Sequence, residues 1–186
     1  MTLKEMIEKV LRLIEEYDKG KESLTSDPDI EAKIKPVINQ VQFELARLKK
    51  IPAVKVLEVK KNQTVDLNTV DSFYQLRLLR FENLNGENAD YDLIENLAVF
   101  HEDGLATVYY FKYPKVITNE TSGDYEFELS MDALEIMPYG VAGDILKSDV
   151  SAQYGAVYTQ RYETMLQRLD PRYAMQSISI EGGVYI

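Results

Sequence analysis

The chain has 186 residues, a formal net charge of −10 at pH 7, 45% hydrophobic residues and no cysteine. This composition is ordinary for a folded domain, and it excludes disulfides, thiolate metal sites and cysteine nucleophiles. The apolar runs are too short to span a bilayer, and the first 20 residues carry charges throughout, unlike a signal peptide. We therefore expect synthesis in the cytoplasm and no membrane association.

The net negative charge is concentrated in the middle of the chain, because the acids of residues 1–50 are balanced by an equal number of lysines and arginines. The segment from Glu82 to Asp103 holds seven acids and no lysine or arginine. Such a surface repels phosphate backbones, so we expect DNA to pass nearby without specific binding. A solvated face that keeps the protein soluble is the simpler interpretation of the same charges.

Two helices are predicted at the N-terminus. Thr2 and Glu5 have the spacing of a capping box, and apolar residues then recur at helical intervals. Asp27 is the expected N-cap of the second helix and Pro28 its first residue. Pro36 lies inside this second pattern and predicts either a kink or a delayed start.

From Val54 onward the hydrophobic period changes to two. Short runs rich in β-branched and aromatic residues continue to residue 130, separated by turn signals. Asp103-Gly104, between two such runs, predicts a β-hairpin. The middle of the chain is therefore expected to form an antiparallel sandwich or small barrel.

Helical spacing returns after Ser130, a plausible N-cap. Gly140 and Gly143 follow a proline within this pattern, and Asp144 would repel a phosphate. The glycines are therefore interpreted as points where one helix approaches another closely, and not as a phosphate loop. A second helix is expected over residues 151–169.

The predicted fold class is α+β, with an antiparallel β module inserted between two pairs of helices. Residues 1–52 and 131–175 form the helical body, residues 53–130 form the β module, and residues 176–186 form an extended C-terminal tail. The tail alternates like a free strand, so we expect it to pair with a neighbouring subunit or another protein.

An aromatic stripe and the tail supply the candidate interface residues. The stripe is typical of a helix core face, although tyrosine also suits a subunit interface. The possible interface residues are Tyr154, Tyr158, Tyr162, Ile178, Ile180, Val184, Tyr185 and Ile186.

No catalytic, metal-binding or cofactor-binding residues are predicted. His101, the single histidine, is adjacent to Glu102, and neighbouring strand positions point to opposite faces, so the two would not share a metal. Two pairs of acids alternate with apolar residues as on half-solvated strands: Asp90 with Asp92, and Glu126 with Glu128. These patterns predict a protein that is not an enzyme.

Three segments carry a family resemblance: "YYFKYPKVIT" followed by "FEL", the helix "MPYGVAGDIL", and the helix "SDVSAQYGAVYTQRYETML". Together they resemble the head–tail connector (adaptor, or neck) proteins of tailed phages and prophages. The likeness extends over nearly the whole chain. Many family members are smaller and purely helical, so the β module would place this chain in a subgroup with an insert.

The resemblance implies a structural component of the virion neck. Such proteins form a ring beneath the portal protein, join the DNA-filled head to the tail or stopper protein, and build the ring body from their helices. The alternative is a carbohydrate-binding or hydrolytic β-sandwich module, with a pocket lined by Tyr74, Tyr91, Tyr109 or Tyr113. A bacterial scaffold or interaction protein unrelated to phages is a third interpretation.

Overall fold

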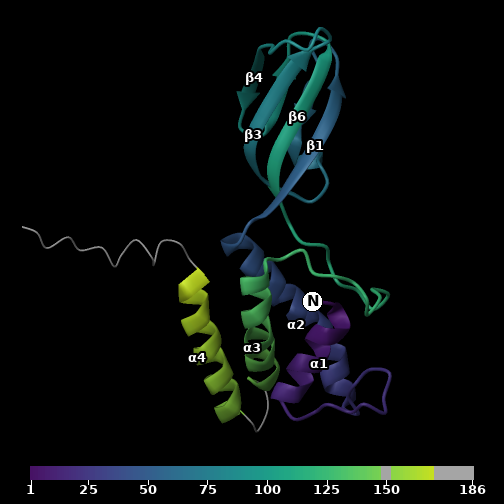
Figure 1. Cartoon of the computed structure of the whole chain (residues 1–186), viewed down its shortest axis with the longest axis vertical. Helices are drawn as coiled ribbons and strands as arrows, with labels where there is room; N and C mark the ends of the chain where they lie inside the picture. Colours follow the sequence, from purple (N-terminus) through teal and green to yellow (C-terminus); the bar gives the residue numbers. More distant parts are fainter. Residues whose placement is uncertain (148–151, 170–186) are drawn as a thin grey trace, which may run out of the picture. The chain divides into compact units, whose positions relative to one another are not determined.

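The computed structural model describes residues 1–147 and 152–169, which form two compact units. The helical unit consists of Met1–Lys49 and the described residues from Val116 onward, and the β unit is Lys50–Lys115. Figure 1 shows helices at both ends of the sequence and strands between them. The predicted α+β class, with helix pairs on either side of an inserted antiparallel β module, is confirmed.

Four helices form the helical unit: α1 (Leu3–Leu13), α2 (Pro28–Leu48), α3 (Met131–Leu146) and α4 (Ala152–Leu169). The predicted capping box at Thr2 and Glu5 opens α1, and Asp27 caps α2. Because α2 begins at Pro28 and continues through Pro36, the internal proline does not delay its start. Most residues of α3 are apolar or small and are buried, and the helix packs against α1, α2 and α4 (Figure 1).

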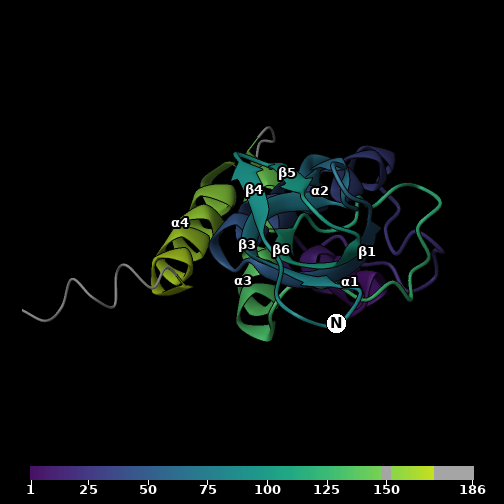
Figure 2. The ribbon, with the colours of Figure 1, turned by 90° about the horizontal axis from the view of Figure 1, so that it is seen from above.

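The β unit contains six strands in two antiparallel sheets. One sheet has the order β1 (Ile51–Val59), β6 (Gly104–Lys112), β3 (Phe73–Asn83). The other has the order β2 (Thr64–Asp66), β5 (Leu97–Phe100), β4 (Tyr91–Ile94), and Figure 2 shows the two layers from above. Phe81 of β3 meets Phe100 of β5 edge to face, with ring centroids 4.9 Å apart, so one core joins the layers.

The hairpin predicted at Asp103-Gly104 is wrong. This dipeptide connects β5 to β6, which belong to different sheets. A Cβ at Gly104 would lie 2.1 Å from the carbonyl oxygen of Glu82, so the glycine permits a close approach of two backbones. The hairpin of this region joins β4 to β5 through Glu95-Asn96, and Glu95 adopts a φ of 55°.

The β unit ends at residue 115, and not at residue 130 as the sequence pattern predicted. Residues 116–130 form no sheet strand; they run along the helical unit with one isolated bridge, between Thr2 and Glu126. The N–H groups of Leu3 and Lys4 donate to carbonyls in this segment. Three apolar side chains of this segment are buried within the helical unit: Ile117, Phe127 and Leu129. Burial of these side chains explains why the sequence pattern resembles that of strands.

Candidate functional site

The inner face of α4 is fitted closely to α3. A Cβ at Gly140 would lie 2.9 Å from the ring of Tyr162, and one at Gly143 would lie 2.6 Å from Oγ1 of Thr159. Real side chains do not tolerate such separations, so both positions need glycine. The interpretation of Gly140 and Gly143 as points of close helix contact is confirmed.

Tyr162 belongs to the core of its own chain. Its side chain is buried, and its hydroxyl donates to Oε2 of Glu44 on α2 at 2.9 Å. Burial raises the pKa of the Tyr162 phenol strongly, and the nearby Glu44 carboxylate raises it further. The phenol is therefore held neutral, and Tyr162 is not accessible to a neighbouring subunit in this structure.

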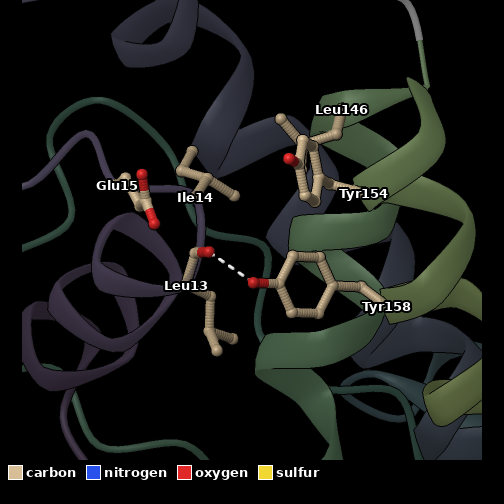
Figure 3. Close-up of a pocket in the computed structure, with 6 residues that line it drawn as sticks. All are labelled: Leu13, Ile14, Glu15, Leu146, Tyr154 and Tyr158. Carbon is tan, nitrogen blue, oxygen red and sulfur yellow. Dashed lines mark hydrogen bonds between the residues drawn. The ribbon is translucent and has the colours of Figure 1, made fainter. Parts of the chain in front are cut away.

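Tyr158 and Tyr154 lie nearer the surface and line a cavity of about 210 Å³ between α1, α3 and α4. Figure 3 shows Tyr158 reaching to the end of α1, where its hydroxyl donates to the carbonyl of Leu13 at 2.5 Å. Glu15 is the one carboxylate among the lining residues. The Tyr158 hydroxyl is thus already engaged by the backbone at the end of α1.

The outer face of α4 is largely exposed, although Tyr154 borders the cavity and Arg161 contacts α3. Its side chains recur at intervals of three and four residues, which places them in one row along the helix. Tyr154 is 70% exposed and Val157 61% exposed, and the guanidinium of Arg161 lies 4.3 Å from the ring centroid of Tyr139. We call this row the α4 stripe: Tyr154, Val157, Arg161, Thr164 and Arg168.

A second exposed apolar surface lies on the β unit. Alternate residues of β1, β6 and β3 lie on the core side of the sheet, so the intervening residues face away from the core. Val54 is 57% exposed, Val56 55%, Leu78 44% and Leu105 46%. We call this surface the outer sheet face: Pro52, Val54, Val56, Glu58, Leu78, Arg80, Glu82, Leu105, Thr107, Tyr109 and Phe111.

Sequence reasoning missed the outer sheet face. Both alternating sets of β1 are apolar, with Val54 and Val56 on one side and Leu57 and Val59 on the other. A period-two pattern identifies the buried side only when the two sets differ in polarity. The apolar residues on both sides of β1 were the sequence signal that could have indicated an exposed apolar face.

The structure does not bring together the residues of the hydrolytic alternative. The Tyr91 hydroxyl donates to the carbonyl of Leu79 and its ring packs on the core, whereas Tyr109 lies on the outer sheet face. Tyr74 and Tyr113 pair with each other, with ring centroids 4.8 Å apart. The four tyrosines therefore do not line a shared pocket.

The candidate acids are likewise dispersed. His101 contacts Asp92 at 3.0 Å, and both side chains are exposed. Glu126 lies beside Thr2, outside the sheets. Within residues 1–147 and 152–169, no group of three or more histidine and acidic side chains is arranged to hold a metal ion. The tail candidates Ile178, Ile180, Val184, Tyr185 and Ile186 lie outside the described residues.

No protein-family model matches the chain, and no curated protein matches it. In the described part of the chain, no helix combines the length and apolar character that crossing a bilayer requires.

Proposed function

We propose that this protein is a head–tail connector of a tailed phage or prophage, a structural virion component that forms a ring under the portal protein. The proposal rests on the segment order of the sequence, which resembles that family. It assigns the protein to the virion neck after synthesis in the bacterial cytoplasm. Its partners would be the portal protein, a tail or stopper protein, and further copies of itself.

The structural observation that best supports the proposal is the division of α4 into two faces. One face is fitted to α3 through Gly140 and Gly143, while the α4 stripe is left exposed, with Tyr154 and Val157 on it. Exposed aromatic, aliphatic and arginine side chains in one row are typical of protein–protein interfaces. A rigid helix that offers one face to solvent suits a subunit of a larger assembly.

The charge of the chain is compatible with this role. The net charge of −10 and the acidic segment from Glu82 to Asp103 disfavour binding to phosphate backbones. A channel component past which DNA moves benefits from such repulsion, because a surface that bound phosphates would slow the passage of the DNA. We expect no catalytic activity and no bound cofactor.

The alternative of a carbohydrate-binding or hydrolytic module has less support. It requires Tyr74, Tyr91, Tyr109 or Tyr113 to converge with acids, and these side chains lie apart. Isothermal titration of the full-length protein with glycans tests it, and saturable binding would favour it over the connector role.

The decisive experiment is quantitative mass spectrometry on tailed particles purified from induced source cells. We expect this chain at the copy number of the portal protein. Empty heads isolated before tail attachment serve as the comparison fraction, and the ratio should be lower there. Intact infectious particles without the chain would contradict the proposal.

The C-terminal tail would add a contact to a neighbouring subunit or to the portal. Deleting residues 176–186 should then reduce the chain's incorporation into particles while its thermal unfolding midpoint stays within about 2 °C of the full chain, since a surface change costs little stability. A large drop in that midpoint would instead assign the tail to the protein's own core.

A further inference from the structure

We propose that the α4 stripe of one copy docks on the outer sheet face of a second copy, giving a head-to-tail contact. This inference rests on the proposed function, because it names the interface that a ring of copies would use. The α4 stripe and the outer sheet face are different surfaces, so the contact is heterologous, and heterologous contacts generate rings when the rotation closes.

The outer sheet face changes character along its strands. Strand register places Val54, Tyr109 and Leu78 in one cross-strand row. Two steps further along is the row of Glu58, Leu105 and Glu82. The face is therefore apolar and aromatic at one end and flanked by two carboxylates at the other.

The α4 stripe has the complementary gradient. Tyr154 and Val157 occupy its N-terminal part, and Arg161 and Arg168 occupy its C-terminal part. The helical repeat of about 3.6 residues per turn places Glu163, the acidic residue of α4, outside this row. An apolar half and a basic half thus follow each other along a single helix face.

The spacing of the two gradients agrees. Along β1, four residues separate Val54 from Glu58, which corresponds to about 13 Å at about 3.3 Å per residue. Along α4, the midpoint of Tyr154 and Val157 lies nine residues from the midpoint of the arginines, or about 13.5 Å at about 1.5 Å per residue. When the apolar halves are in contact, the arginines therefore reach the level of the carboxylates.

The charges on both surfaces are available for such a contact. Glu58, Glu82, Arg161 and Arg168 are exposed, and none of them forms a salt bridge with another described residue. Arg161 stacks on the ring of Tyr139 on its own chain, 4.3 Å from the centroid, and this contact leaves its positive charge without a carboxylate partner among the described residues. Arg80 also lies on the outer sheet face, but its guanidinium lies over the ring of Tyr109, 5.7 Å from the centroid. The two carboxylates outnumber this cation at the acidic end.

The face of this sheet is more accessible to a partner than its edges. In the edge strand β1, Pro52 has no N–H to donate, and Lys55 occupies a core-side position while remaining exposed. The other edge strand, β3, contains two register shifts. Prolines, inward-pointing charges and bulges are devices that prevent pairing along a sheet edge. A docked helix on the face avoids all three.

Charge reversal in the full-length protein tests the contact. The sheet variant carries Glu58→Arg and Glu82→Arg, and the helix variant carries Arg161→Glu and Arg168→Glu. A control variant with Glu102→Arg and Glu163→Arg changes the net charge as the sheet variant does, but at exposed residues off both surfaces. Sedimentation velocity over a concentration series at low and high salt reports association and monomer shape.

We expect the wild type and the control to self-associate, more weakly at high salt because ions screen the charge pairs. Each reversed variant alone should associate at least about tenfold more weakly, since like charges then oppose each other. An equimolar mixture of the two reversed variants should recover association, because each contact again joins opposite charges. Only pairing between these two surfaces of different copies predicts that recovery.

Three results would overturn the proposal. The first is a wild type that stays monomeric at every concentration. The second is a pair of reversed variants that associate like the control. The third is a mixture that stays monomeric while the sedimentation coefficient of each variant monomer changes, which indicates that α4 docks within its own chain.

This test separates the interface from the proposed function. If particles contain the chain at the portal's copy number but the reversed variants associate normally, the connector role stands and this interface falls. If mixing restores association but intact particles lack the chain, the interface stands and the connector role falls.

Discussion

The side-chain amide of Asn39 on α2 makes both hydrogen bonds that the backbone of Ile117 offers. Its Nδ2 donates to the Ile117 carbonyl at 2.7 Å, and its Oδ1 accepts from the Ile117 N–H at 2.8 Å. A side chain thus replaces the neighbouring strand that this extended backbone would otherwise need. The pairing fixes the chain to the helical unit where it leaves the β unit.

Replacing Asn39 with aspartate should destabilise the helical unit by about 1–3 kcal/mol. A carboxylate accepts from the Ile117 N–H but opposes the Ile117 carbonyl, which loses its donor. Urea unfolding followed by circular dichroism measures the change. Asn119→Asp, in the same segment and with the same charge change, should cost less than about 0.5 kcal/mol; equal losses would refute the role of the pairing.

Alanine at Gly143 should lower stability although alanine is the better helix former. Alanine gains about 1 kcal/mol of helix propensity, but its Cβ would meet Oγ1 and the backbone nitrogen of Thr159, at 2.6 and 3.1 Å. Overpacking of this kind costs about 1–3 kcal/mol, so a net loss and a lower unfolding midpoint are expected in calorimetry. Gly123→Ala, where the nearest atom is 3.4 Å away, is the control and should leave the midpoint unchanged.

Phenylalanine at Tyr162 should change how stability depends on pH. The phenol in the unfolded chain ionises near its ordinary pKa of 10.0, whereas burial raises the pKa of Tyr162 in the folded protein. Above about pH 10 the folded state therefore binds more protons than the unfolded state, and stability falls as pH rises. Tyr162→Phe removes this contribution.

Urea unfolding at pH 8 and pH 11 compares the wild type with Tyr162→Phe. At pH 8 the variant should be about 0.5–1.5 kcal/mol less stable, because the hydrogen bond to Glu44 is lost. The wild type should lose more stability than the variant between the two pH values. Parallel losses would show that the Tyr162 phenol ionises equally in both states.

Truncating Phe100 to alanine should destabilise the β unit by about 3–5 kcal/mol, since this fully buried ring joins both sheets. Hydrogen exchange with mass spectrometry should show faster exchange within residues 50–115 and unchanged protection in α1 to α3. Leu97→Ala, at an exposed position of the same strand, is the control. Equal loss of protection in the helices would mean that the two units unfold together.

The helical parts were predictable because their signals are local. Thr2 with Glu5, and Asp27 with Pro28, mark helix starts through hydrogen bonds and backbone angles within one turn. Gly140 and Gly143 were recognisable because glycine within helical spacing needs a packing reason. These features depend on neighbours a few residues away, which a single sequence contains.

The missed features depend on distant partners. Residues 91–100 contain no glycine or proline that would signal a turn, whereas in the structure Glu95 turns the chain back and separates β4 from β5. Ile117 and Phe127 lie in runs with strand-like alternation, but both are buried within the helical unit. The backbone of Ile117 bonds to the side chain of Asn39 and not to a strand. Local pattern reports that a residue is buried and extended; it does not report which element buries it.

The first and last positions of the β unit's long sheet are cross-strand neighbours, since Ile51 pairs with Lys112. The folded β unit thus holds together the two ends by which it joins the rest of the chain. Because its two ends are held together, the folded 66-residue β unit acts for the helical unit like a short loop. Closing a short loop costs little conformational entropy. A helical unit could therefore have acquired the β unit, and with it a new surface, at a small entropic cost to its own folding.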